Sequence, residues 1–292
     1  SFKRQTSAQA RLRKCWERGT YDAMRFLYLA AAIDLAIRSE MKLTNSHDTV
    51  LRSFRKEHAL IVTHDVDWPR DGPGASHVLA RRDRFDAEVI RRVVEEGFNP
   101  YYGVSAVAEI EERFDIRSTF FFRAAYDDGM TVDGYRDVLE ELARNGWEIG
   151  LHVNDPSTVE KIASEKKSLE MVAKVPVYGS RIHYLRVSND TFSNLAGAGL
   201  RYDSSLMYSK DRVDSRNSGF LAKDGLIVFP ITFMDAYLFT YMGVTEENVV
   251  SFVVNALDGL YASGVQIATL LWHDNSIMMK GGRAYAKLID RL

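Results

Sequence analysis

Short apolar runs alternate with longer amphipathic segments along the chain from residue 58 onward. The apolar runs, which are typical of buried strands, are residues 59–63, 118–122, 148–152, 177–179, 200–203, 227–230 and 265–272. The longer segments have the apolar spacing of helices and cover residues 135–145, 159–172, 190–198 and 246–261. Strands that alternate with helices of this length predict an α/β fold with a parallel sheet, open or closed into a barrel.

Residues 1–57 show a different pattern, because no strand-like alternation occurs before His58. Thr20 can cap a helix that runs to about Glu40. The apolar stretch at 26–37 is interrupted by Asp34 and is well short of the roughly 20 residues that a membrane span needs. We therefore expect a helical extension over residues 1–57, packed on a domain of residues 58–292, and no membrane span.

Composition narrows the class of protein. The 292 residues are 46% hydrophobic and 27% charged, which is a globular composition with enough length for one sizeable core. The formal net charge is -2 and no long run of Lys and Arg occurs, so nucleic acid is not an expected partner. The single cysteine, Cys15, excludes a disulfide within the chain and a cysteine-based zinc cluster. No signal-peptide pattern opens the sequence, and we expect a cytoplasmic protein of unknown oligomeric state.

Ionisable residues follow five of the predicted strands at their carboxyl ends, where the loops of a parallel sheet or barrel converge. They are Asp65 and Asp67, His152, Arg181 and His183, Asp203, and His273. A histidine at a strand end is more often a hydrogen-bonded core residue than a ligand. Asp65 and Asp67 are harder to explain as structural residues, because they lie one residue apart on one face and repel unless a cation or a shared proton relieves them.

Carboxylate and imidazole together, with no thiolate available, suit zinc or another divalent transition metal. Such an ion lowers the pKa of a bound water enough to produce hydroxide near neutral pH. A second carboxylate close to the ion could remove the proton. The pair Asp65 and Asp67 therefore suggests one aspartate that holds metal and one that acts as a base.

The sequence resembles the polysaccharide deacetylases of carbohydrate esterase family 4, the NodB homology group. The resemblance covers residues 58–292 and rests on motifs that occur in the family's order: the D-x-D pair, STFFF, EIGLH, R-x-H-Y, YDSS and LLWH. It implies a distorted (β/α) barrel, commonly with fewer than eight strands. It also implies a hydrolase that uses a metal, most often zinc, to remove an acyl group, usually acetyl, from an N-acylated sugar.

Four positions match the catalytic residues of the family. The resemblance implies that Asp65 is the general base and that Arg181 orients it. The backbone N–H of Tyr184 would help to bind the oxyanion. His273 would act as the general acid toward the leaving amine.

The metal ligands match less completely. The resemblance makes Asp67 and His152 ligands, but the second histidine of the family's H-x-x-x-H motif is replaced by Pro156, which has no side-chain donor. The family's arginine motif has a proline where this chain has His183. We expect His183 to supply the missing imidazole. Asp155 is a second candidate and His77 a third.

Several assignments stay open. Asp203 and Asp274 are candidates for hydrogen bonds that fix the tautomer of a histidine, and Asp203 ranks first. Residues 229–235 resemble the family region that borders the site, without an assigned role. Two other functions compete with the deacetylase: a C–N hydrolase that acts on a small amide, a nucleotide sugar or a lipid-linked sugar, and a degenerate barrel that binds carbohydrate without catalysis. A measurement of the metal content would distinguish the non-catalytic barrel from the two enzymes.

Overall fold

The computed structural model describes residues 58–292. The predicted N-terminal extension, with the helix expected from Thr20 and the apolar stretch at 26–37, lies outside the described residues. The boundary at residue 58 thus remains a prediction. None of the helices in residues 58–292 combines the length and the apolar character needed to cross a membrane.

A single sheet of nine strands organises the described part of the chain, in the order β6-β7-β5-β4-β3-β2-β1-β9-β8. Every neighbouring pair is parallel except β6 and β7. The strands are β1 (Ala59–Val66), β2 (Thr119–Phe122), β3 (Glu148–Val153), β4 (Gly179–Ile182), β5 (Tyr202–Asp203), β6 (Leu221–Lys223), β7 (Leu226–Val228), β8 (Phe233–Met234) and β9 (Ile267–Leu271). The predicted parallel sheet is confirmed.

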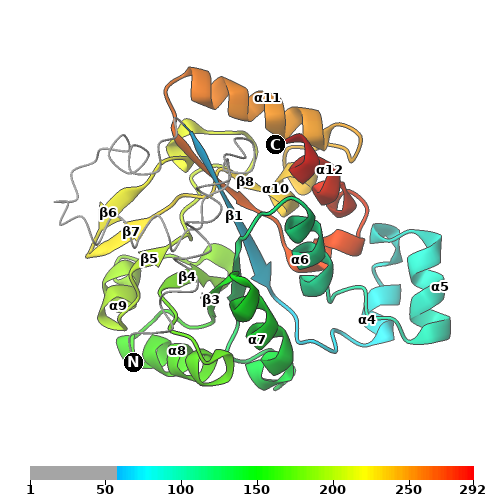
Figure 1. The fold of residues 1–292 in the computed structure, drawn as a ribbon, viewed down its shortest axis with the longest axis horizontal. Helices are drawn as coiled ribbons and strands as arrows, with labels where there is room; N and C mark the ends of the chain where they lie inside the picture. Colours follow the sequence, from blue (N-terminus) through cyan, green and yellow to red (C-terminus); the bar gives the residue numbers. More distant parts are fainter. Residues whose placement is uncertain (1–57) are drawn as a thin grey trace.

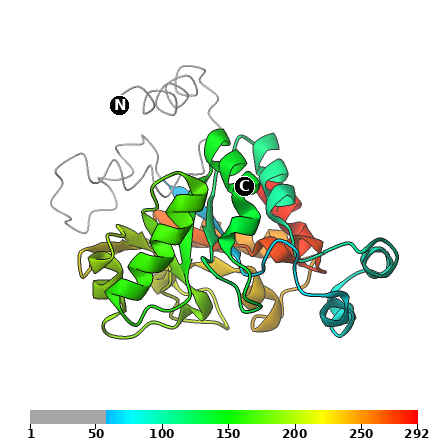
Figure 2. The ribbon, with the colours of Figure 1, turned by 90° about the horizontal axis from the view of Figure 1, so that it is seen from below.

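Helices cover the outer face of this sheet (Figure 1). They are α4 (Ala75–Leu79), α5 (Ala87–Glu96), α6 (Val104–Arg113), α7 (Arg136–Asn145), α8 (Val159–Ala173), α9 (Thr191–Gly197), α10 (Asp235–Thr240), α11 (Val249–Ala262) and α12 (Tyr285–Arg291). The four predicted helices correspond to α7, α8, α9 and α11. Helices α4 and α5 stand to one side of the others in both views (Figures 1 and 2).

The sheet curls so that its inner face encloses a second core. Ala59 and Ile61 of β1 pack there with Phe121 of β2, Ile227 of β7 and Ile267 of β9. The N–H of Gly219, just before β6, donates to the carbonyl of Ile267 at 2.7 Å, which brings this segment beside β9. The predicted distorted (β/α) barrel is therefore confirmed, as a curled sheet that is not closed by a regular pair of strands.

Both faces of β1 are buried, which is why its sequence is a continuous apolar run. Leu60, Val62 and Val66 face the helices, while Ala59 and Ile61 face the inside of the barrel. Because side chains alternate along a strand, Asp65 continues the inner face at the carboxyl end of β1. The carboxylate of Asp65 therefore lies at the mouth of the barrel.

Two short strands were not predicted, and one was misplaced. β6 and β8 have three and two residues, too few for a period-two pattern to be visible. The strand predicted at 177–179 lies instead at Gly179–Ile182. Ser180 and Arg181 place polar groups inside the barrel, so a prediction based on apolar runs ends this strand too early.

A buried carboxylate joins β1 to the helices behind it. Glu111 of α6 is fully buried, and its two oxygens accept hydrogen bonds from His64 (2.9 Å), Ser118 (2.7 Å), Trp147 (2.7 Å) and Tyr285 (2.7 Å). Burial alone would raise the pKa of Glu111, but the charge and hydrogen bond of His64, with the bonds of Tyr285 and Ser118, lower it below its ordinary value. The ionised form therefore stabilises the fold.

We predict that Glu111→Ala lowers the free energy of unfolding by about 3–5 kcal/mol, because it leaves His64 buried without its charged partner. The neighbouring Glu112→Ala, an exposed position, should cost less than about 1 kcal/mol. Urea unfolding at pH 7 measures both. The contribution of Glu111 should be complete above pH 4.5, the ordinary pKa of a glutamate, and decline as the pH falls, since the pKa is lowered in the folded state. Equal effects of the two substitutions would contradict this account.

Candidate metal centre and active site

Asp65 is buried at the mouth of the barrel and faces an arginine that crosses the interior from β4. The Arg181 Nη1 lies 3.3 Å from Asp65 Oδ1 and 3.5 Å from Oδ2. Its other terminal nitrogen donates to Thr63 Oγ1 at 3.0 Å and to Ser204 Oγ at 3.1 Å. A fully buried guanidinium thus neutralises Asp65 and fixes its orientation.

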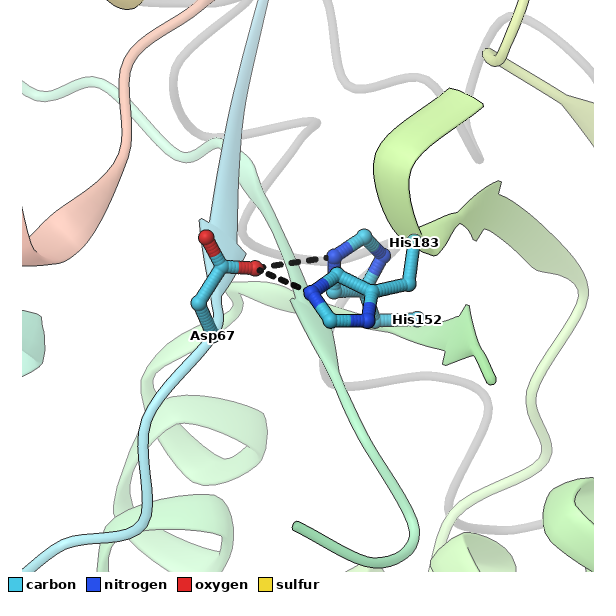
Figure 3. A group of neighbouring side chains, drawn as sticks. All are labelled: Asp67, His152 and His183. Carbon is cyan, nitrogen blue, oxygen red and sulfur yellow. Dashed lines mark hydrogen bonds and ion pairs between the residues drawn. The ribbon is translucent and has the colours of Figure 1, made fainter. Parts of the chain in front are cut away.

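Asp67 takes different partners, although it lies only two residues further along. Its Oδ1 is 3.0 Å from His152 Nε2 and 3.8 Å from His183 Nε2, and Figure 3 shows both rings turned toward this oxygen. One potential ligand atom from each of the three residues lies within 4.8 Å of the others. Burial alone would raise the pKa of Asp67, but the hydrogen bond from His152 and the charges of the surrounding histidines hold it well below its usual range.

Both imidazoles turn a ring nitrogen toward Asp67. The Nδ1–H of His152 donates to the backbone carbonyl of Arg181 at 2.9 Å, which orients Nε2 toward Asp67 and toward the position of a cation. Burial and the neighbouring His152 lower the pKa of His183 to about 4, so its ring is neutral at physiological pH. One carboxylate and two neutral imidazoles are a donor set for zinc or a similar divalent ion. The residues present therefore fit a metal site.

The two other candidates for the third ligand do not join this cluster. Asp155 pairs with Lys161 Nζ at 2.7 Å and accepts from the Ser157 N–H. His77 packs edge-on against Trp68 and Tyr101. The expectation that His183 takes the place left by Pro156 agrees with this geometry.

His273 has a carboxylate partner that sequence reasoning did not find. Asp235, at the start of α10, accepts from the His273 backbone N–H at 3.0 Å and lies 2.6 Å from its Nδ1. Burial disfavours protonation of the ring, but the charge and hydrogen bond of Asp235, followed by the charges of Asp67 and Asp65, raise the pKa of His273 to about 10. The ring is thus a cation, and its Nε2 lies 3.8 Å from Asp67 Oδ2.

The expectation that Asp203 or Asp274 orients a histidine is wrong. Asp203 accepts from the hydroxyls of Ser180 and Ser205, both at 2.8 Å, and holds β4 against the segment after β5. Asp274 accepts from the Gly103 N–H at 3.0 Å, and burial raises its pKa to about 7. Asp203 was a candidate because it lies at a strand end, and Asp274 because it follows His273 directly, whereas the carboxylate that contacts His273 is Asp235, which comes from another strand end.

Tyr184 stands beside the cluster with a constrained backbone. Its ring stacks on His183 with the centroids 3.8 Å apart. Tyr184 and Leu185 have φ angles of 62° and 53°, in the left-handed region that non-glycine residues rarely adopt. Such conformations are typical of functional sites.

Arg123, directly after β2, also belongs to the site and was not predicted. Its guanidinium donates to the Asp67 carbonyl at 3.2 Å, to Asn154 at 2.6 Å and to Asp127 at 2.7 Å. Arg123 thereby connects the segment that carries Asp67 to the loop that follows β3. Arg123 directly follows the STFFF motif, so a search for ionisable residues at the carboxyl ends of strands could have found it.

A cleft with a volume of about 1010 Å³ opens over these residues. Asp67, His183, Tyr184 and His273 line it. All seven predicted site residues are thus brought to one end of the barrel, while their individual roles remain predictions.

Comparison with known proteins supports the fold. The sequence matches no protein-family model and no curated protein sequence. The structure is similar to that of a "putative polysaccharide deacetylase" from Mycobacterium smegmatis, with a TM-score of 0.55 and 22% identity over 80% of this chain and 82% of that chain. The fold of the polysaccharide deacetylases, predicted from the motifs, is therefore confirmed.

Two other solved structures are less similar, with TM-scores under 0.5. One is described as a "putative polysaccharide deacetylase involved in o-antigen biosynthesis" from Bordetella bronchiseptica, with a TM-score of 0.48, 13% identity and coverage of 86% and 78% of the two chains. The other is a pseudoenzyme of carbohydrate esterase family 4 from Bacillus anthracis, with a TM-score of 0.45, 11% identity and coverage of 80% and 60%.

We predict that the purified protein binds about one equivalent of Zn²⁺ or Co²⁺ through Asp67, His152 and His183. His183→Ala should weaken binding by about 100-fold or more, since even the hydrogen-bond partners of metal ligands contribute 10- to 100-fold. His77→Ala removes an imidazole from the same cleft without touching the cluster and should leave the affinity unchanged. Isothermal titration calorimetry after chelation measures the metal affinity of the wild type, His183→Ala and His77→Ala. An unchanged affinity in His183→Ala would exclude this ligand.

Proposed function

We propose that this chain, which has the polysaccharide deacetylase fold, is a metal-dependent hydrolase that removes an acyl group, in the first instance acetyl, from the nitrogen of an amino sugar. The observation that carries the proposal is the convergence of three groups at one end of the barrel. They are the donor set of Asp67, His152 and His183, the paired carboxylate of Asp65, and the cationic ring of His273.

Asp67, His152 and His183 would hold the metal, and zinc suits this donor set. When bound, the ion would polarise the acyl carbonyl and lower the pKa of a water. The chain's own residues account for the movement of protons and for the orientation of the reacting groups.

Asp65 accepts the proton of the attacking water as the water oxygen bonds to the acyl carbon. Arg181 keeps this carboxylate in place through its contacts with Asp65 and Thr63. The backbone N–H of Tyr184, next to the cluster, would donate to the acyl oxygen as negative charge develops there.

His273 gives its proton to the nitrogen as the carbon–nitrogen bond breaks, and the products are a carboxylic acid and a free amine. Asp235 keeps the ring protonated before the reaction. The two proton carriers therefore differ in environment: Asp65 is a buried carboxylate whose charge is balanced by Arg181, and His273 is an imidazolium whose charge is balanced by Asp235. Opposite protonation states of this kind are what general base and general acid catalysis require.

The alternative of a non-catalytic barrel rested on Pro156, which removes a ligand from the family motif. His183 weakens this argument, because its imidazole lies where it can complete the donor set. A small-amide hydrolase would use the same residues and differs from the proposal in its substrate.

We expect the metal-loaded protein to release acetate from an N-acetylated amino sugar, and chelation to stop the reaction reversibly. Asp65→Asn should lower kcat by about 100- to 10,000-fold, the usual contribution of a positioned base, and retain the metal. Asp128→Asn, a carboxylate of the same cleft that caps the Met130 N–H, serves as the control and should remain active. Full activity in Asp65→Asn would refute the role of the base.

The role of Asp235 predicts a change in pH dependence. Asp235 raises the pKa of His273, so Asp235→Asn should lower this pKa toward the ordinary histidine value of 6.5. The protonated acid is then lost at lower pH, and the alkaline limb of the kcat profile should move toward neutrality. Ser276→Ala removes a hydrogen bond to Asp235 but leaves its charge, and should shift the limb less. Identical profiles for wild type and Asp235→Asn would show that His273 is not the acid.

A further inference from the structure

The cleft extends beyond the metal centre to residues of α4 and of the segment before α5, among them His77 and Arg84. These helices stand to one side of the molecule (Figure 2). Between these helices lies a short 3-10 helix, η2 (Arg82–Arg84). The loop after η6 (Asp274–Met278) closes this part of the cleft, because the Lys280 N–H donates to the Arg84 carbonyl at 2.8 Å. The region is thus held to the barrel and belongs to the same cavity as the proposed catalytic residues.

Aromatic side chains line the cleft between the two ends. Trp68 directly follows Asp67, and its ring centroid lies 4.8 Å from that of His77 and 5.0 Å from that of Tyr101. The rings of His77 and Tyr101 are 5.5 Å apart. Packed rings of this kind form a rigid wall, against which a sugar can lie while its neighbouring groups reach further along the cleft.

Three cationic side chains line the far end of the cleft: Arg81, Arg84 and Lys280. Lys280 Nζ donates to the backbone carbonyl of Asp83 at 3.1 Å, and Arg81 Nη1 lies 3.5 Å from the His77 carbonyl. Within residues 58–292, no ion pair joins any of the three to a carboxylate. The nearby Arg283, in contrast, pairs with both Asp86 and Glu246.

Two residues of the aromatic wall, His77 and Tyr101, adjoin this charge. Burial lowers the pKa of His77, and the charges of Arg81 and Arg84 lower it further. Tyr101 is buried, and its hydroxyl has no hydrogen-bond partner among the described residues. Three cations that pair with no carboxylate of residues 58–292 therefore adjoin a wall that contains an unsatisfied hydroxyl, and this composition suits a site for an anion.

We propose that Arg81, Arg84 and Lys280 form a subsite for a phosphoryl group, so that the substrate is a phosphate ester or diphosphate of an acylated amino sugar. The identity of the sugar rests on the proposed function; the anion subsite does not. Guanidinium groups suit phosphate oxygens because they donate paired, charge-assisted hydrogen bonds. The cleft, at about 1010 Å³, has room for more than a single sugar ring.

Inorganic pyrophosphate, titrated calorimetrically into the full chain, tests the subsite directly. Arg81→Ala and Arg84→Ala should each weaken binding about tenfold or more, the usual effect of losing one charge-assisted contact. Arg82→Ala removes the same charge from the same 3-10 helix at a position that does not line the cleft, and should bind as wild type does. Acetate at the same ionic strength should bind far more weakly.

Pyrophosphate also binds divalent ions, so it could bind at the metal centre. The Asp67→Ala variant distinguishes binding at the metal centre from binding at the subsite. Binding that persists in Asp67→Ala and declines in Arg84→Ala is the expected result. The inference is overturned if wild type does not bind pyrophosphate, if Asp67→Ala alone abolishes binding, or if Arg82→Ala weakens it as much as Arg84→Ala does.

Kinetics distinguish this inference from the proposed function. With N-acetylglucosamine 1-phosphate and N-acetylglucosamine as probes, Arg84→Ala should raise KM for the phosphorylated sugar alone and leave kcat unchanged. Pyrophosphate binding without acetate release from either sugar would support the subsite and contradict the deacetylase. Acetate release from the neutral sugar, without pyrophosphate binding, would support the deacetylase and contradict the subsite.

Discussion

Repulsion between two carboxylates at the end of β1 is the constraint on which the site depends. Asp65 and Asp67 lie on one face of an extended segment, and neither could remain ionised there without compensation. The fold supplies a different partner to each: the guanidinium of Arg181 for Asp65, and imidazoles for Asp67. This separation gives the two chemically identical side chains different surroundings, which suit the proposed roles of Asp65 in proton transfer and of Asp67 in binding a cation.

Arg181 connects the two halves of this arrangement. Its guanidinium contacts Asp65, while its backbone carbonyl accepts the Nδ1–H of His152 and so presents Nε2 to Asp67. The residue can do both because β4 lies three positions from β1 in the curled sheet, and its side chain crosses the barrel interior. The core beneath, built from residues such as Ile61 and Phe121, supports this crossing from below.

The parts of the structure that follow from local sequence could be predicted. The strand ends that carry Asp65, His152 and His273 come directly after apolar runs, and the parallel sheet brings them together. Asp235 could not be found in the same way, because it follows a strand of two residues and lies 38 positions from His273. The strand-end pattern already placed His183 at the rim that carries Asp67. Its assignment as the third ligand required the family resemblance, since only the replacement of the motif histidine by Pro156 singled out the extra imidazole.

The proposed metal centre joins these observations, because the proposed base, the proposed acid and the proposed substrate site are all arranged around Asp67. The most direct test is a crystal structure of the protein soaked with Zn²⁺, with anomalous diffraction recorded at the zinc absorption edge. The account predicts one strong anomalous peak, coordinated by Asp67 and by Nε2 of both His152 and His183, at about 2.0–2.2 Å. No peak between these residues, or a peak held by Asp155 or His77 in place of His183, would contradict it.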